Sequence, residues 1–297
     1  MLSKNGRPAA ICLTGATLLM ASCGSGDRAS ERILGQSWEI GNGSVTPYAE
    51  FASDGSPSAV GIVYTANALE GLPAAASDGH HCFDRDSSGS IEPATECLAT
   101  HETVMPLPDA VTTHADIPYK WVLFNWNPVG HIPPGIYDVP HFDIHFYIDS
   151  IADVFALDVG PCGPEFVRCD QFERATKPLP ANYMPPDYIS VDAVAPAMGN
   201  HLVDPTGPEF NGEQWTRNWI FGTYDGEVTF YEEMVTLAYL KSRPDVCNPV
   251  KSPPAVGRSG FYPGLSCIRY DGATDTYSVS MEGFTYREAS PPQAASL

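Results

Sequence analysis

Short segments rich in aromatic and β-branched residues, each bounded by Gly, Pro, Asn or Asp, constrain the fold of this chain more than any other feature. They span residues 44–52, 59–65, 121–125, 141–148, 215–224 and 227–240, and the last two flank Asp225-Gly226, a strong hairpin signal. No window has the periodicity of a long amphipathic helix, and 28 Pro and 26 Gly among 297 residues supply many turns. We therefore predict a mainly β protein: an antiparallel β-barrel or sandwich, cupin-like or related, with Pro/Gly-rich loops.

The first residues have the pattern of an export signal. A positively charged start precedes a mostly apolar run over residues 9–20, which is too short for a comfortable membrane span. Met20-Ala-Ser-Cys23 is similar to a bacterial lipobox, in which the Cys is lipidated, although Met replaces the usual Leu. We expect residues 1–22 to be a signal peptide, Cys23 to carry the lipid, and residues 23–37 to form a tether. The mature protein would then be an exported lipoprotein anchored to a membrane of the bacterial envelope, periplasmic or at the cell surface; simple secretion is the alternative.

The cysteine content supports export. Apart from Cys12 in the signal segment and the lipidation site Cys23, the chain has six cysteines, an even number that favours disulfides in an oxidising compartment. Zinc ligation by these thiols is the competing interpretation, but no Cys-x-x-Cys is present. The sequence alone does not choose among connectivities, and pairing in sequence order joins Cys82 with Cys97, Cys162 with Cys169 and Cys247 with Cys267.

The pairs also suggest how the chain is organised. We expect a β-rich core domain over residues 38–240, with a disulfide loop at 82–97 and a Pro-rich loop at 160–195. Residues 241–297 would form a C-terminal extension that carries a disulfide hairpin, with Asp271-Gly272 as its turn.

The charge balance excludes one class of partner. The formal net charge is −20, so the surface repels phosphate backbones and nucleic-acid binding is disfavoured. Acidity otherwise serves solubility or the binding of cations.

The acidic segment between Cys82 and Cys97 is similar to the first part of an EF-hand calcium loop. Its candidate ligands are Asp84, Asp86, Ser88, Ser90 and Glu92, with Gly89 at the turn. At the last loop position, where a Glu normally binds the ion through both oxygens, the chain has Thr95, and Glu96 follows one residue late. Calcium binding is therefore one hypothesis, and a polar, disulfide-closed loop with Asx turns is the other.

The segment His141-Phe-Asp-Ile-His-Phe-Tyr147 alternates polar and apolar residues. In a strand, His141, Asp143 and His145 share one face, and the intervening apolar residues share the other. The Cα atoms of His141 and His145 would be roughly 13 Å apart, too far to chelate one ion comfortably, whereas residues two apart are separated by roughly 6.6 Å. Asp143 with one of the two histidines is thus the better chelating pair.

Further metal ligands must come from elsewhere, and two segments offer them: His201 in one, Glu232 and Glu233 in the other. His131, Tyr147 and Glu233 are candidates to contact a substrate or to support the ligands. Imidazoles combined with carboxylates suit Zn, Mn, Fe or Ni. A hydrogen-bonded His–Asp–His network and a metal-free acid/base site are the alternatives.

Several longer stretches carry a resemblance: residues 43–63, 68–73, 125–147, 198–204 and 224–236, of which the run from Trp126-Asn-Pro to His-Phe-Tyr147 is the most specific. Together they resemble a domain-of-unknown-function family of exported bacterial proteins typified by a sigma-E-regulated Thermus protein. The resemblance covers about residues 38–240. It implies a compact β-rich domain and ring-like homo-oligomers, but no established activity.

The resemblance also implies a set of site residues. The family has Glu-Pro-Met where this chain has Glu232-Glu233-Met234, so Glu232 is the matching carboxylate and Glu233 is a departure. Asn200 and Leu202 also depart from the family pattern, whereas His201 is kept. The candidate metal ligands implied are His141, Asp143, His145, His201 and Glu232.

Three functional hypotheses follow. The first is a lipid-anchored protein that binds a divalent metal, as a cupin-like metalloenzyme acting on a small molecule. The second is a non-catalytic, stress-related binding or scaffold protein of the envelope. The third is a zinc hydratase of the α-carbonic anhydrase type, suggested by Asp143-Ile-His145 and His201-Leu-Val and opposed by the absence of a histidine at 143. Nucleophilic catalysis is poorly supported, because no Gly-x-Ser-x-Gly is present and the cysteines are assigned to disulfides.

Overall fold

The computed structural model describes residues 31–294. The predicted signal peptide, the predicted lipidation site Cys23 and part of the tether lie outside these residues. Within them, no helix is both long enough and apolar enough to cross a membrane.

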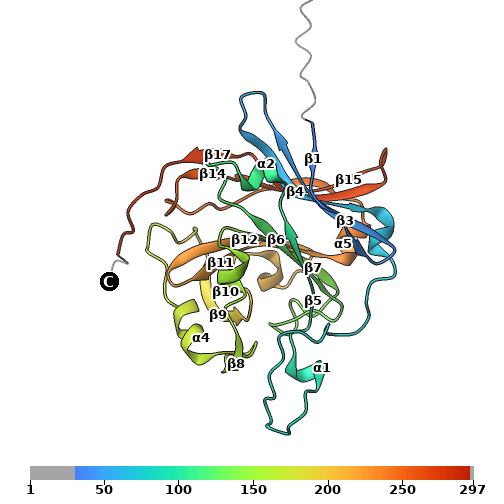
Figure 1. Ribbon diagram of the computed structural model, residues 1–297, viewed down its shortest axis with the longest axis vertical. Coiled ribbons are helices and arrows are strands. Elements are labelled where there is room, and N and C mark those ends of the chain that lie inside the picture. The colour runs from blue at the N-terminus through green and yellow to red at the C-terminus, as the bar shows by residue number, and fades with distance from the viewer. Residues whose placement is uncertain (1–30, 295–297) are drawn as a thin grey trace, which may run out of the picture.

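Two antiparallel sheets of seven strands face each other (Figure 1). The first sheet contains β1 (Ile33–Leu34), β3 (Gly43–Phe51), β4 (Pro57–Thr65), β16 (Thr276–Glu282), β15 (Leu265–Asp271) and β13 (Asp245–Pro249) in that order, with β2 (Trp38–Ile40) paired to β3. The second sheet has the order β5 (His101–Pro106), β6 (Trp121–Asn127), β7 (His141–Tyr147), β12 (Glu227–Thr236), β11 (Arg217–Tyr224), β10 (Gly199–Val203) and β9 (Ile189–Ala195). The predicted mainly β, antiparallel class is confirmed, in its sandwich form; neither sheet of the described residues closes into a barrel.

Smaller elements connect the strands. β14 (Gly260–Tyr262) pairs with β17 (Thr285–Arg287), and β8 (Val159–Cys162) precedes the longest helix. The helices are α1 (Pro93–Glu96), α2 (Asp109–Thr112), α3 (Ile151–Val154), α4 (Cys169–Ala175) and α5 (Leu237–Lys241), with 3-10 turns η1 (Ala66–Leu69) and η2 (Pro208–Asn211). In Figure 1, α1, α4 and β8 lie on the side of the second sheet that faces away from the first.

Apolar faces of the two sheets meet in the main core. Ile62 and Val279 from the first sheet belong to the same buried cluster as Phe124, Phe142 and Phe146 from the second, and all are at most 1% exposed. Burying each such side chain contributes about 1.5–3 kcal/mol. This face of β7 is therefore committed to packing, and the polar residues that alternate with Phe142 and Phe146 along the strand point to the other face.

The C-terminal segment completes the first sheet. β16 pairs with β4 from residue 276 to residue 282, and β15 pairs with both β16 and β13. The predicted hairpin around Asp271-Gly272 is the β15–β16 connection. The boundary predicted at residue 240, between core domain and C-terminal extension, thus falls between strands that pair with each other in one sheet.

All three predicted disulfides are present: Cys82–Cys97, Cys162–Cys169 and Cys247–Cys267. The first closes the acidic loop, the second joins β8 to the start of α4, and the third links the neighbouring strands β13 and β15. Each forms between residues close in sequence.

The strand predicted over 227–240 is four residues too long. β12 ends at Thr236, whose side-chain oxygen accepts a hydrogen bond from the Tyr239 backbone N–H at 3.1 Å. This N-cap starts α5 and turns the chain out of the sheet.

Candidate functional site

The polar face of β7 is buried although it points away from the main core. Phe142, Ile144 and Phe146 lie in the core between the sheets, as the alternation predicts. On the opposite face His141, Asp143 and His145 are at most 4% exposed, because loops cover this side of the second sheet. A row of ionisable groups has therefore been removed from water, which is costly unless the groups have partners.

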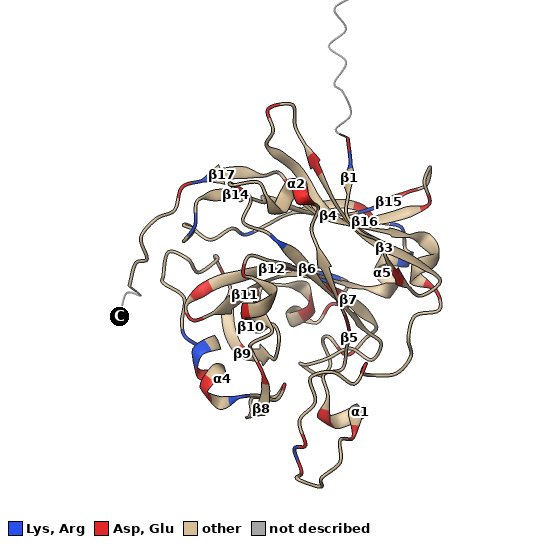
Figure 2. Cartoon of the chain, in the orientation of Figure 1, with Lys and Arg blue, Asp and Glu red and all other residues tan. Residues whose placement is uncertain are grey.

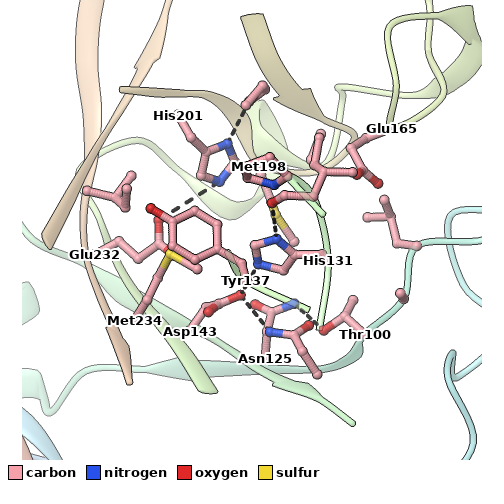
Figure 3. Close-up of a pocket in the computed structure, with 18 of the residues that line it drawn as sticks. Thr100, Asn125, His131, Tyr137, Asp143, Glu165, Met198, His201, Glu232 and Met234 are labelled. Atoms are coloured by element: carbon pink, nitrogen blue, oxygen red, sulfur yellow. Dashed lines mark hydrogen bonds and ion pairs between the residues drawn. The ribbon is translucent and has the colours of Figure 1, made fainter. Parts of the chain in front are cut away.

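A cavity of about 290 Å³ opens on this polar face (Figure 3). Its floor comes from β6, β7, β10, β11 and β12, and its walls from β9 and the loops near residues 98–100, 131–137 and 164–165. Asp143, His145, His201 and Glu232 all line it, and so does His131. His141 lies behind its wall.

His145, His201 and Glu232 form one group of facing side chains, here called the open cluster. Strand pairing sets it up, because Glu232 on β12 lies directly opposite His145 on β7. His201 reaches the group from β10 across β11. The distance from Glu232 Oε1 to His145 Nε2 is 3.5 Å, and that from Glu232 Oε2 to His201 Nε2 is 3.9 Å. Two ligands on one tetrahedral zinc ion, each about 2.1 Å from it, lie roughly 3.4 Å apart.

Backbone carbonyls orient both imidazoles of the open cluster. His145 Nδ1 donates to the Leu123 carbonyl at 3.1 Å, and His201 Nδ1 donates to the Ala193 carbonyl at 2.8 Å. Both Nε2 atoms are thereby left as acceptors facing Glu232. Donation of the second ring nitrogen to a carbonyl is the usual support for a metal-binding histidine.

Two backbone features place His201. A β-bulge between His201 and Leu202 interrupts the pairing of β10 with β9, and bulges re-aim side chains. Opposite His201 is Gly222, where any Cβ would meet the ring of Phe230 at about 1.9 Å. Glycine is therefore needed there so that Phe230 can pack against both His145 and His201, with ring centroids 5.0 and 5.1 Å apart.

Burial leaves the open cluster without a positive charge. It lowers the pKa of His145 to about 3 and that of His201 to about 4, so both rings are neutral near pH 7. Burial also raises the pKa of Glu232 well above its usual range, and the nearby charges of Asp143 and Glu233 add to the effect. Glu232 Oε2 is buried with no hydrogen-bond donor. A cation bound between these three groups would give Glu232 Oε2 the positively charged partner that it lacks.

His131, His141 and Asp143 form a second group, here called the paired cluster. Asp143 Oδ2 accepts from Asn127 Nδ2 at 2.7 Å and from His131 Nε2 at 3.3 Å. Its Oδ1 lies 3.2 Å from His141 Nε2, a contact that is not aligned as a hydrogen bond. The Nδ1 atoms of both histidines donate to backbone carbonyls, those of Ile132 and Val139.

Charges within the paired cluster compensate each other. Burial alone would raise the pKa of Asp143, but His141 and His131 outweigh it and hold that pKa well below its usual range. Burial would likewise lower the pKa of His131, and Asp143 reverses the shift and raises it. These opposite shifts are those of an internal ion pair.

The five predicted metal ligands therefore do not form one group. The expected separation of His141 from His145 is present, since the two residues belong to different clusters. Asp143, expected to join His201 and Glu232, instead groups with His141 and His131. The reason is the register of β12 against β7, which sets Glu232 beside His145 and Met234 beside Asp143.

The three supporting residues have different positions. His131 is in the paired cluster and at the cavity. Tyr147 stacks on Trp121 with centroids 4.2 Å apart and lies beside His145, outside the cavity wall. Glu233 points to the opposite face of β12, where it forms an ion pair with Arg217 and accepts from Ser266 at 2.6 Å. Glu233 is thus a buried link between the sheets and not part of the site.

Sequence reasoning missed two amides of the site, Asn125 and Asn127 on β6. Both are at most 1% exposed and line the cavity. The alternation of β6, with Val122, Phe124 and Trp126 on the core face, is the signal that could have placed them.

The acidic loop brings together Asp84, Asp86 and Glu96, three carboxylates that could hold an ion. Glu96 accepts from the backbone N–H groups of Arg85 and Glu92 at 2.8 and 2.9 Å. Asp84 and Asp86 each accept from the Ser88 backbone N–H. Of the remaining predicted calcium ligands, the Ser88 hydroxyl donates to the Ser90 carbonyl at 3.0 Å, and Glu92 is exposed and stands outside the carboxylate group.

Fold and site together define a class: a disulfide-linked antiparallel β-sandwich with a partly open cavity, lined by histidines and carboxylates, on the outer face of one sheet. No protein-family model, curated protein or solved structure matches the chain. Membership of the exported bacterial family that the sequence resembles stays a prediction.

Proposed function

We propose that this chain is an exported metalloenzyme that binds a divalent transition metal through His145 Nε2, His201 Nε2 and the Glu232 carboxylate and acts on a small molecule in the adjoining cavity. One observation supports the proposal above all others. Two imidazoles, each oriented by a backbone carbonyl, face a fully buried carboxylate oxygen that has no donor. Native proteins rarely leave such a group unsatisfied unless a ligand completes it.

The donor set limits the choice of metal. Two neutral imidazoles and one carboxylate, without thiolate, suit Zn²⁺ and non-haem Fe²⁺, and also Mn²⁺ and Ni²⁺. The cysteines of the described residues are all in disulfides. The zinc hydratase hypothesis is weaker than that of a cupin-like metalloenzyme, because the third group in the open cluster is a carboxylate, whereas a hydratase of the α-carbonic anhydrase type would have a third histidine.

Access to the cluster favours catalysis over a structural metal. Structural zinc sites have four protein ligands, whereas catalytic sites have three and leave a position for water or substrate. Here three side chains meet at the wall of a cavity, and no fourth ligand is grouped with them among residues 31–294. A bound divalent cation would polarise a carbonyl or acidify a bound water.

The protein's own groups have defined parts in this scheme. His145 and His201 bind through neutral rings, and Glu232 supplies the compensating negative charge. His131 lines the same cavity and shares a proton with Asp143 at its Nε2 atom, so it is placed to exchange a proton with a ligand. Export and membrane anchoring through Cys23 belong to the proposal as well, as does assembly into a homo-oligomer.

Metal analysis of protein purified without a His-tag tests the proposal. We expect close to one transition-metal ion per chain in the wild type and loss of that ion in His201→Ala and Glu232→Ala. His114→Ala, which removes an imidazole on the far side of the core, should retain the metal. A wild type that neither retains metal nor gains thermal stability with Zn²⁺, Mn²⁺, Fe²⁺ or Ni²⁺ would contradict the proposal and leave the non-catalytic binding protein.

A further inference from the structure

The cavity beside the open cluster is small. Its volume is about 290 Å³. An apolar protein cavity of about 150 Å³ holds one benzene molecule, so this one has room for roughly twelve non-hydrogen atoms. Polymers, lipids and nucleotides are too large to be enclosed in it.

Most of the cavity wall is apolar. Its larger apolar side chains are Leu98, Ile132, Val203, Phe210, Ile220 and Met234. They come from several strands and loops, so an enclosed ligand would meet apolar surface on more than one side. Burying an apolar ligand against such a wall is favourable at about 25 cal/mol per Å².

The charges around the cavity disfavour ionic ligands. Carboxylates of Asp143, Glu165 and Glu232 line it, and the lining residues within the described part of the chain include neither Lys nor Arg. Anion sites in proteins normally use those cations. Acidic residues, red in Figure 2, are also spread over the loops, and the net charge of −20 repels anions at longer range. A metal in the open cluster would repel a cationic ligand but attract an anion, so the exclusion of anions applies to the metal-free cavity.

Besides the carboxylates of Asp143 and Glu232, one uncharged side chain among the described lining residues has an oxygen without a hydrogen-bond partner. Asn125 is 0% exposed and lines the cavity, yet its Oδ1 accepts no hydrogen bond. Its amide nitrogen is occupied, because Nδ2 donates to Thr100 Oγ1 at 3.0 Å and to Glu102 Oε1 at 3.4 Å. The carboxylate of Glu102 can only accept here, so it fixes which end of the amide is the oxygen. A buried acceptor of this kind costs about 1–3 kcal/mol until a donor reaches it.

From these observations we infer the ligand class: a small, uncharged, mostly apolar molecule with one N–H or O–H group that donates to Asn125 Oδ1. The inference deepens the proposed function and rests on it for the role of the metal, while size, wall chemistry and Asn125 define the ligand. Asn125 is thus a specificity-determining residue of the cavity.

Three probes of equal size and shape test the inference: benzamide, acetophenone and benzoate. Benzamide is neutral and carries N–H donors, acetophenone replaces the NH₂ group by CH₃, and benzoate is the anion. NMR titration of the metal-free wild type should rank their affinities benzamide, then acetophenone, then benzoate. We expect a ratio of about five to ten between the first two, the usual value of one hydrogen bond to an uncharged acceptor.

The variant Asn125→Leu should lower the affinity for benzamide to that for acetophenone and change the affinity for acetophenone less than about twofold. Asn200→Leu is the matched control, because Asn200 is another buried amide with an unpartnered Oδ1 and lies outside the cavity wall. Asn200→Leu should leave the ratio of the affinities for benzamide and acetophenone unchanged. The wild-type ranking needs no variant, so the inference stays falsifiable if Asn125→Leu fails to fold.

Titrations on metal-free and zinc-loaded protein separate this inference from the proposed function. If zinc does not bind but metal-free protein still prefers benzamide, the metal proposal fails and the ligand class stands. If metal-free protein binds benzoate as tightly as benzamide, the ligand class is wrong. An unchanged benzamide-to-acetophenone ratio in Asn125→Leu would overturn it, as would the absence of binding by all three probes.

Discussion

The open cluster and the paired cluster use the same residue types, two imidazoles and one carboxylate, and both start from β7, yet they compensate charge in opposite ways. In the paired cluster Asp143 has Asn127 and His131 as donors and the His141 ring beside it. In the open cluster Glu232 meets only two rings whose pKa values are lowered to about 3 and about 4. In the first arrangement Asp143 Oδ2 has donors from the protein, although Asp143 Oδ1 and His141 Nε2 have no hydrogen bond; in the second, Glu232 Oε2 has no donor at all and a cation would complete it. Residue types alone therefore do not define a metal site. What distinguishes the two clusters is whether groups of the protein already donate hydrogen bonds to the carboxylate.

The largest effect should come from removing the carboxylate charge of the paired cluster. Asp143→Asn leaves the half-buried His131 without its counter-charge and should destabilise the metal-free protein by about 3 kcal/mol. This is the low end for a broken buried ion pair, because His131 can release its proton. Glu232→Gln should do the reverse and stabilise the metal-free protein by about 1–2 kcal/mol, because it removes a buried carboxylate that has no donor. Urea denaturation of metal-free protein at pH 7 measures both.

Opposite signs for these isosteric substitutions are the central test of the comparison. Both variants exchange one oxygen for an NH₂ group on neighbouring strands, so differences in volume cannot explain the result. If Glu232→Gln destabilises the metal-free protein as much as Asp143→Asn does, the open cluster is paired by groups of the protein itself, and the contrast between the clusters is wrong.

A second effect separates the two histidines of the opening motif. His145→Ala should weaken zinc binding at least about 100-fold, which corresponds to about 2.7 kcal/mol, because a direct ligand matters more than the supporting groups that cost 10–100-fold. His141→Ala removes an equally buried imidazole from the same strand face and should change zinc affinity less than about threefold. Competition with a chromophoric chelator gives both constants. Comparable losses in the two variants would show that the ion sits between the clusters.

Much of the fold is predictable because it follows from local rules. Alternation identifies the apolar and polar faces of β7, and the cysteines pair with near neighbours in sequence. The rise per residue along a strand is enough to place His141 and His145 too far apart to share one ion. Strands such as β5 and β9 escape prediction, because the sequence of β5 is more polar and β9 is largely exposed.

The grouping of site residues cannot be predicted in the same way. Which carboxylate meets His145 depends on how β12 pairs with β7, more than 80 residues later in the chain. A shift of that register by one residue would exchange Glu232 for Glu233, and the packing of the second sheet against the first opposes it, because the shift would turn the core-facing residues of β12 outward. Asn125 escapes prediction for a related reason, because its partners Thr100 and Glu102 come from the neighbouring strand region.

The smallest expected effect concerns pH, and here the two clusters again differ in sign. An unfolded imidazole has a pKa near 6.5, whereas burial lowers that of His201 to about 4 in the folded protein. Above pH 6.5 this residue has no effect on stability; as the pH falls from 6.5 towards 4, the unfolded state takes up the proton first and stability is lost. The pKa of His131 is raised, so its stabilising contribution is present below pH 6.5 and is lost as the pH rises through the folded value.

Denaturation of metal-free protein at pH 8 and pH 5 should therefore show His201→Gln losing about 1–2 kcal/mol less stability than the wild type on acidification. His131→Gln should be more destabilising at pH 5 than at pH 8. The exposed His80→Gln serves as the control and should follow the wild type, and parallel pH profiles for all four proteins would mean that the clusters do not differ in charge.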